Sequence, residues 1–279
     1  MGSLFWIQTA GLIRDTFREA MARKIFWGLF GLSTLMILFV LFLLRIDVVE
    51  GATATIGLFG FERTRLMDVD RIVRGAHSFV AAFLYSFGMF LAVFASAGLV
   101  PAILEPGRIE LLLSKPVGRA HILFGRFAGT LLVVTANIAW LVAGVWVVFG
   151  WKTGIWNAAF LWTIATTVFL FSVLLSVVFL TGVAFESTAL STMIPVAMII
   201  VSPILAQERT MVKLMSSEWS RQVWRGLYYA LPKAADLAMV TLGLVRDRQA
   251  DWWWPVWTSG VFGAVSLAAA VILFRRRDF

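Results

Sequence analysis

The sequence predicts an all-α membrane protein with six transmembrane helices, and two observations carry this prediction. The first is composition: 60% of the 279 residues are hydrophobic and only 14% are charged, whereas a soluble globular chain has about 25% charged residues. The second is a set of apolar runs that contain no charged side chain. Each run has about 20 residues or more, which is enough to cross a hydrocarbon core about 30 Å thick as a helix.

The whole chain, 1–279, is expected to form one transmembrane domain. The six spans are predicted at 25–44, 79–104, 127–150, 156–185, 187–207 and 252–274. Residues 1–24 are predicted to form an amphipathic helix on the membrane surface, with Phe17 on its apolar side and Arg14 and Arg18 on its polar side. Lys and Arg are denser in the segments on the side of the two termini, so both termini are expected in the cytoplasm.

Two long loops are then predicted on the external face. Residues 45–78 contain a polar, charge-balanced stretch around Gly51, which is typical of an irregular loop. Residues 208–251 differ, because Trp219, Val223 and Leu227 recur every four residues and would form an apolar stripe on a helix. A further apolar piece, Ala234–Val245, is too short to span. We therefore expect two interfacial or re-entrant helices there.

Several classes of function are disfavoured. The net charge of +8 fits membrane-edge topology better than nucleic-acid binding. The spans hold no ionisable group, which disfavours an ion-coupled carrier. No phosphate-binding loop and no cysteine is present. His77 and His121 lie at span edges without acidic partners at metal-ligand spacing, so we interpret them as interfacial side chains. We expect no catalytic, cofactor or metal site in this chain.

Residues 105–126, between spans two and three, are the most unusual segment. An apolar cluster from Ile109 to Leu113 is followed by the helix breaker Ser114-Lys115-Pro116 and then a basic run. This pattern indicates an amphipathic helix that docks on a partner outside the membrane, and the alternative is a linker resting on lipid headgroups. In the next loop on the same side, Glu186 is either a solvated turn carboxylate or a second partner contact, and Ser187 is a candidate helix cap.

Small residues recur every four positions in the second span, at Gly88, Ala92 and Ser96. Small side chains allow two helices to approach closely where no hydrophobic force drives them together. We expect this face to pack against another helix, and packing within the chain is favoured over a contact between subunits.

The segment 105–126 resembles the first cytoplasmic loop of permease subunits of the type-two (ABC-2) class of ABC exporters. The resemblance is carried by Glu105, Gly107, Ile109-Glu110-Leu111-Leu112-Leu113, Ser114-Lys115-Pro116-Val117-Gly118-Arg119 and Gly125-Arg126. Pro106, Arg108 and Arg126 depart from the usual residues. More loosely, the layout is similar to the permease of the nitrous-oxide-reductase copper-site maturation system.

The resemblance implies a homodimeric export permease in a bacterial plasma membrane, surrounded by lipid. Two cytoplasmic ATPase subunits would bind ATP and Mg²⁺, and this chain would not be an enzyme. The loop would act as a coupling helix. The residues that the resemblance assigns to ATPase coupling are Glu105, Gly107, Arg108, Ile109, Glu110, Leu112, Leu113, Lys115, Pro116 and Arg119. Glu186 and Ser187 would form a second ATPase contact. The alternative is a scaffold that transmits force to an external protein without passing cargo.

Overall fold

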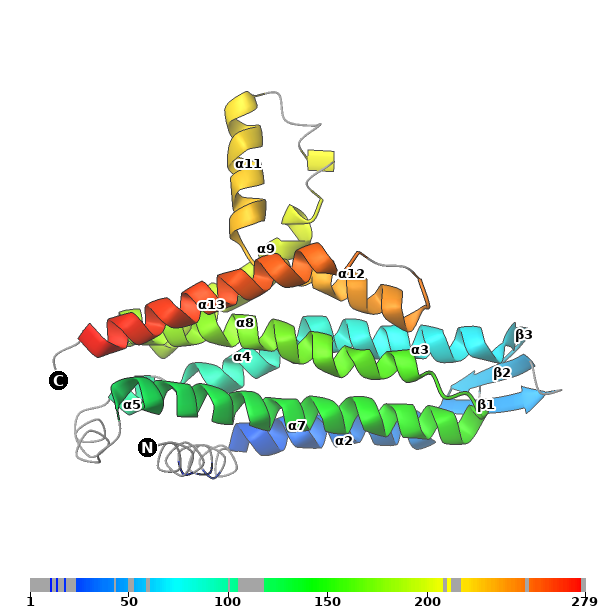
Figure 1. The fold of residues 1–279 in the computed structure, drawn as a ribbon. Helices are drawn as coiled ribbons and strands as arrows, with labels where there is room; N and C mark the ends of the chain where they lie inside the picture. Colours follow the sequence, from blue (N-terminus) through cyan, green and yellow to red (C-terminus); the bar gives the residue numbers. More distant parts are fainter. Residues whose placement is uncertain are drawn as a thin grey trace.

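The computed structural model describes most of the chain. The described residues are 11, 14, 18, 24–42, 44–49, 53–58, 61–99, 101–104, 118–207, 210–211, 217–248 and 251–276. The predicted helix over 1–24 and residues 105–117 lie almost entirely outside them. The described part is a bundle of long helices with a small sheet at one end (Figure 1).

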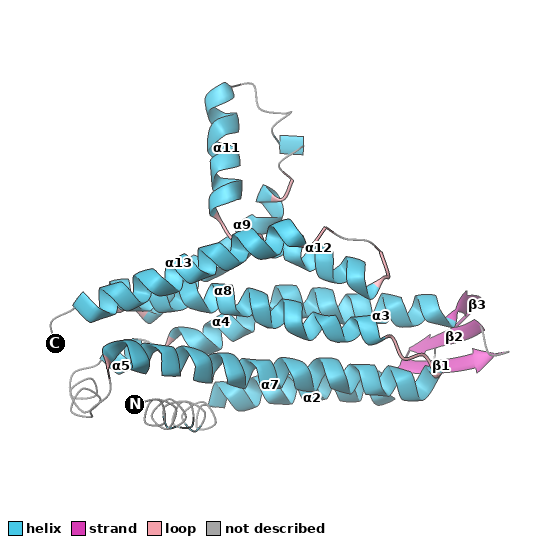
Figure 2. Ribbon diagram, in the orientation of Figure 1, coloured by secondary structure: helices cyan, strands magenta, loops and turns pink. Residues whose placement is uncertain are grey.

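Helices make up the membrane part of the fold, as predicted (Figure 2). The helical elements are α2 (Lys24–Phe42), α3 (Val69–Phe83), the π-helix η1 (Leu84–Gly88), α4 (Met89–Ala97), α5 (Pro101–Leu104), α7 (Arg119–Thr153), the 3₁₀ turn η2 (Ala158–Leu161), α8 (Trp162–Phe185), α9 (Thr188–Leu205), α11 (Glu218–Ala230), α12 (Ala234–Val245) and α13 (Trp253–Arg276).

Five helical stretches among the described residues are long and apolar enough to cross a membrane. They are Val69–Ala97, Arg119–Thr153, Ala158–Phe185, Thr188–Leu205 and Trp253–Arg276. The apolar part of α2, Phe26–Phe42, is shorter. The chain is therefore a multi-pass helical membrane protein, and the sixth span stays a prediction.

The loop predicted to be irregular contains an antiparallel sheet in the order β1-β2-β3, which corrects the all-α prediction for this segment. Its strands are β1 (Leu44–Val49), β2 (Thr53–Leu58) and β3 (Phe61–Asp68). In the register, Ile46 pairs with Ile56 and Leu58 pairs with Phe61. The alternation of Leu44, Ile46 and Val48 with charged residues is the period-two pattern of a strand, and the turn residues nearby obscured it.

The second predicted span begins earlier than expected, because α3 starts at Val69 rather than at 79. Val69, Ile72 and Val73 are buried along one side of α3, as an amphipathic helix requires. Asp68 caps the helix, since its side chain accepts a hydrogen bond from the Asp70 backbone N–H at 3.0 Å. Charged residues on the other side made this stretch look like a loop.

His77 is fully buried rather than interfacial, which overturns the interpretation from sequence. Its ring stacks on Phe160 with the ring centroids 4.1 Å apart, and it meets Phe149 edge-on at 5.1 Å. Both neighbouring rings lie beyond position 145, so their contact with His77 depends on the tertiary fold. His77 therefore acts as an aromatic packing residue that ties α3 to α7 and η2.

Helix α8 lies at the centre of the bundle. It contacts α13, α9, α7, α4 and α12. In the most apolar 18-residue stretch of Ala158–Phe185, which includes α8, 67% of the residues are buried, whereas the corresponding share is 28% for α9 and for α13. Helix α13 packs along α8 with one buried stripe: Pro255, Ser259, Gly263, Ser266, Ala270 and Phe274. Mostly small residues in this stripe allow the two backbones to come close.

Helices α11 and α12 confirm that the predicted loop 208–251 contains two helices separated at Pro232. Helix α11 projects at a steep angle from the long helices (Figure 1), and none of its residues is buried. Trp219, Val223 and Leu227 are all exposed. Helix α12 instead packs against α3, α8 and α9.

The closest approach of α13 to α8 predicts a strong effect of adding volume at Gly263. A Cβ atom there would lie 3.3 Å from the Val173 Cα and 3.2 Å from its Cγ2, so the two backbones would have to separate. We expect Gly263→Val to destabilise the protein by about 1–3 kcal/mol, measured as a lower midpoint of thermal aggregation in detergent.

Gly260 supplies the matched control on the same helix. A Cβ atom there would lie 3.6 Å from the Phe169 ring, an ordinary contact with a side chain that can move. We expect Gly260→Val to leave the midpoint close to that of the unmodified protein. Equal midpoints for the two variants would contradict the close α8–α13 contact.

Candidate functional site

One end of the bundle holds the described members of the predicted ATPase contacts, Arg119, Glu186 and Ser187, and we call it the C-terminal end. It contains α5, the start of α7 at Arg119, the α8–α9 turn at Glu186, and the end of α13 at Arg276 (Figure 1). The opposite end, which holds the strands, is the sheet end. Residues Glu105, Gly107, Arg108, Ile109, Glu110, Leu112, Leu113, Lys115 and Pro116 lie outside the described residues.

Arg119 is the described member of the predicted coupling set, and it lies at the start of α7. Gly118, in an extended conformation, is the N-cap of this helix. The Arg119 Nη1 donates a hydrogen bond to the Arg275 carbonyl oxygen at 3.4 Å. This hydrogen bond joins the start of α7 to the end of α13. Residues 119–126, predicted as loop, are helical.

Glu186 and Ser187 form the tight turn between α8 and α9. Glu186 adopts a left-handed conformation with a φ of 51°, and its N–H bonds to the Gly182 carbonyl. Ser187 is the N-cap of α9, because its Oγ accepts a hydrogen bond from the Leu190 N–H at 3.4 Å. The predicted cap is confirmed. Both side chains are exposed or half-exposed at the C-terminal end, and nothing in the structure tests a contact with an ATPase.

The predicted small-residue face in the second span lies within the described residues. Ala92 and Ser96 are buried, and Gly88 is half-buried at the end of η1. All three line a cavity that α2 and α7 border on the other side. The face therefore points into the protein, and the space it leaves is only partly filled.

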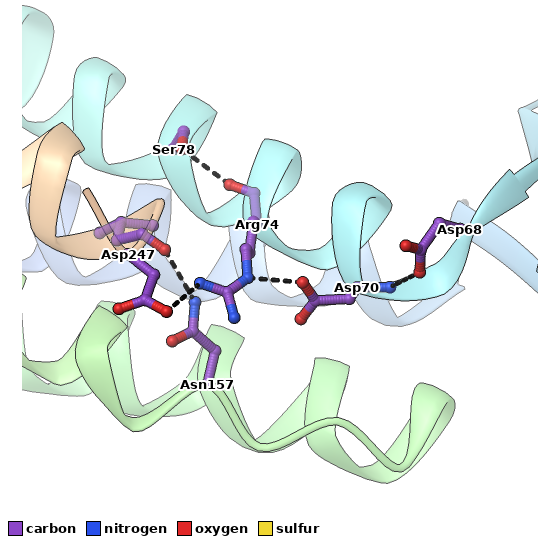
Figure 3. Close-up of polar contacts among 7 residues, drawn as sticks. Asp68, Asp70, Arg74, Ser78, Asn157 and Asp247 are labelled. Atoms are coloured by element: carbon purple, nitrogen blue, oxygen red, sulfur yellow. Dashed lines mark hydrogen bonds and ion pairs between the residues drawn. The ribbon is translucent and has the colours of Figure 1, made fainter. Parts of the chain in front are cut away.

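The sheet end holds a charged cluster that the sequence reasoning missed (Figure 3). The Arg74 Nε donates to the Asp70 Oδ2 at 2.6 Å, and its Nη1 lies 3.8 Å from the Asp247 Oδ2. The Arg246 Nε donates to the Ser78 Oγ at 3.0 Å. Asp247 has a φ of 57°. The contacts of Arg74 with Asp247 and of Arg246 with Ser78 fasten the end of α12 to α3. Sequence reasoning missed them because the partners are at least 168 positions apart.

A buried lysine lies where α11 joins α12. Lys233 is only 2% exposed, and its Nζ lies 3.7 Å from the centroid of the Tyr228 ring, with Tyr229 and Trp254 at 5.0 and 5.3 Å. Its backbone N–H donates to the Ser259 Oγ at 3.0 Å. Cation–π contacts compensate for burying the ammonium group. Sequence reasoning did not find this contact, because the aromatic partners lie on different helices: Tyr228 and Tyr229 on α11 and Trp254 on α13.

No group of three His, Asp or Glu residues within the described part of the chain is placed to hold a metal ion. The polar contacts instead connect helices to one another at each end of the bundle.

Comparison with known proteins gives one informative result. A search of the curated proteins found no match. The family model described as ABC-2 family transporter protein matches residues 12–279, which is nearly the whole chain. The chain therefore belongs to the ABC-2 transporter family, whose members are membrane transport components that normally work with a cytoplasmic ABC ATPase.

Proposed function

We propose that this chain is the transmembrane permease subunit of an ATP-driven exporter. A separate cytoplasmic ATPase would bind ATP and Mg²⁺ and hydrolyse the nucleotide, and this chain would convert the resulting motion into movement of cargo. Membership of the ABC-2 family supports the transport role. The finer assignment rests on how the candidate coupling segment connects to the bundle.

The connectivity at the C-terminal end is the observation that carries the proposal. Helix α5 ends at Leu104 and α7 begins at Arg119, so the proposed coupling segment connects the α4–α5 stretch to the long helix α7. A partner that moves this segment pulls directly on α4–α5 and on α7. Through the Arg119–Arg275 hydrogen bond, the same pull reaches α13.

The proposed coupling helix would dock by its apolar face. Ile109, Leu112 and Leu113 fall on one side of a helix, because they are spaced three and four residues apart. They would fill a groove on the ATPase, while charged neighbours such as Glu110 set the register at its rim. Glu186 and Ser187 would add a second contact, since the turn that contains them lies at the same end of the bundle.

We further propose six spans with both termini in the cytoplasm of a bacterium. Helix α2 would be the first span, because its 19 residues reach about 28 Å at 1.5 Å per residue. The Lys152 Nζ donates to the Val40 carbonyl at 3.1 Å, and the Ser33 Oγ donates to the Asn137 Oδ1 at 3.0 Å, so α2 is joined to α7 along its length. Two copies of the chain would bind two ATPase subunits.

A second reading makes the chain a scaffold that transmits force to an external protein without passing cargo. The length of α7 supports it, since its 35 residues reach about 52 Å, roughly 20 Å more than a hydrocarbon core. The sheet end, with the Arg74 cluster, would then project from the membrane as a rigid external surface.

The coupling proposal predicts that Leu112→Asp uncouples the complex. A charge on the docking face would cost too much to bury in the groove, so we expect the ATPase to dissociate and transport to fall to background while the protein stays inserted. Co-purification and ATP hydrolysis by the complex in nanodiscs measure both effects.

Leu111→Asp is the matched control, because position 111 falls on the other side of the same helix. It should leave ATPase binding and hydrolysis nearly unchanged. Undiminished co-purification of the Leu112→Asp variant would refute the coupling assignment.

The topology can be tested directly because the chain has no cysteine. We expect a cysteine at position 64, in β3, to react with a membrane-impermeant maleimide applied to intact spheroplasts. A cysteine at position 110 should react only after the membrane is opened. The reverse pattern would place the termini outside. Labelling of both positions in intact spheroplasts would reject a membrane span between positions 64 and 110 and, with it, the cytoplasmic location that the coupling role requires.

The two readings differ in what stimulates ATP hydrolysis by the complex in nanodiscs, where both faces are accessible. The export reading predicts stimulation by small apolar or peptide-like compounds in a library. The scaffold reading predicts no response to such compounds and stimulation by a soluble fraction from outside the membrane. Stimulation by a library compound that also accumulates in sealed vesicles would exclude the scaffold reading.

A further inference from the structure

A cavity of about 80 Å³ lies between α2, the η1–α4 segment and α7. Its walls are mainly apolar, with aromatic, leucine, valine and methionine side chains from the three helices. On the α4 side the wall includes the small residues Gly88, Ala92 and Ala95 beside larger ones such as Met89 and Leu91. Leu32 both lines the cavity and is 39% exposed, so the cavity borders the outer surface of the bundle, which faces the membrane.

Within the described part of the chain, Asn137 supplies an amide donor without a partner in this cavity. Its Oδ1 accepts a hydrogen bond from the Ser33 Oγ at 3.0 Å. Its Nδ2 is buried and has no hydrogen-bond partner among the described residues. Two of the hydroxyl groups nearby are engaged locally, since Ser96 donates to the Ala92 carbonyl and Thr130 donates to the Arg126 carbonyl. The Thr167 Oγ1, which also lines the cavity, is buried without a hydrogen-bond partner among the described residues. A buried amide left without a partner costs free energy.

We propose that this cavity binds the end of an aliphatic molecule that carries an oxygen acceptor, taken up from the membrane phase. The alkyl part would contact the apolar walls, and a hydroxyl or carbonyl oxygen would accept a hydrogen bond from the Asn137 Nδ2. This site is independent of the proposed function.

The volume sets the size of the guest. An apolar cavity of about 150 Å³ accommodates benzene, and drug-sized ligands occupy about 300–1,000 Å³. The 80 Å³ observed here therefore admits a short alkyl segment but not a whole drug-like molecule. The unpaired donor favours a guest with an oxygen atom over a plain hydrocarbon.

The absence of native cysteines provides a direct assay. A single cysteine at Ala95, which lines the cavity, would be alkylated with N-ethylmaleimide in detergent, with and without 1-hexanol. At an alcohol concentration about four times its Kd, occupancy should slow alkylation about fivefold. The matched control is a single cysteine at Ala136, which is exposed on α7 and should react at the same rate throughout.

The hydrogen bond is tested in the Ala95→Cys background with Asn137→Leu, which keeps the volume and removes the donor. We expect about fivefold weaker binding of 1-hexanol, so the same alcohol concentration should slow alkylation less than about twofold. Protection by n-hexane should be unchanged. Asn137→Leu leaves the Ser33 hydroxyl without its acceptor, which could disturb the local structure. The double variant Ser33→Ala, Asn137→Leu removes that hydroxyl, so it separates loss of binding from local misfolding. It should behave as Asn137→Leu alone.

The remaining outcomes decide the proposal. Slow alkylation of the position 95 cysteine in phosphatidylcholine nanodiscs without added alcohol, relieved in detergent, would assign the site to a lipid chain. Rates that change equally at positions 95 and 136, or protection that Asn137→Leu leaves intact, would overturn the proposal. So would a position 95 cysteine that reacts at one rate under every condition.

Discussion

The contact between α8 and α13 is the constraint on which the rest of the bundle depends. No hydrophobic force drives apolar helices together in lipid, so their association depends on close van der Waals packing. Gly263 lets α13 approach the Val173 backbone of α8, and the stripe on either side of it stays buried. With α13 on one side and α7, α9 and α4 on others, α8 becomes the fixed element against which the remaining helices are placed.

The two ends of the bundle are fastened by different chemistry. At the C-terminal end, the hydrogen bond from Arg119 to the Arg275 carbonyl joins helices at their ends, where water and a partner protein can compete. At the sheet end, Arg74 contacts both Asp70 and Asp247, and His77 is stacked on Phe160 inside the protein. Exposed ion pairs contribute little on their own, so we expect the stacked rings to stabilise the sheet end more than the Arg74 ion pairs do.

The sequence predicted the parts of the fold that depend on composition and local period. Apolar runs located the long helices, and a four-residue apolar stripe located α11. Ser187 was recognised as a cap because capping is local. The failures have a common cause. His77 was assigned to the interface because its partners, Phe149 and Phe160, are more than seventy positions away, and Arg74 meets Asp247 only in the folded chain. The strands were missed because charged residues alternate with apolar ones in β1, where a search for uncharged runs finds nothing.

The cavity beside α4 has a structural consequence of its own. The π-helix η1 interrupts the stretch from Val69 to Ala97 directly before α4, and a π-bulge inserts a wider turn that weakens the regular hydrogen-bond ladder. On one side α4 packs against the buried α8, and on the α2 side it borders empty space next to Gly88 and Ala92. Side chains that line a void lose the van der Waals contacts that close packing would give them. Of the helices that lead to the segment 105–117, α4 is thus the one with both a pivot and room to move, whereas α7 is an uninterrupted rod of 35 residues. Under the proposed function, a pull on that segment would bend α4 at η1 and shift α7 as a whole.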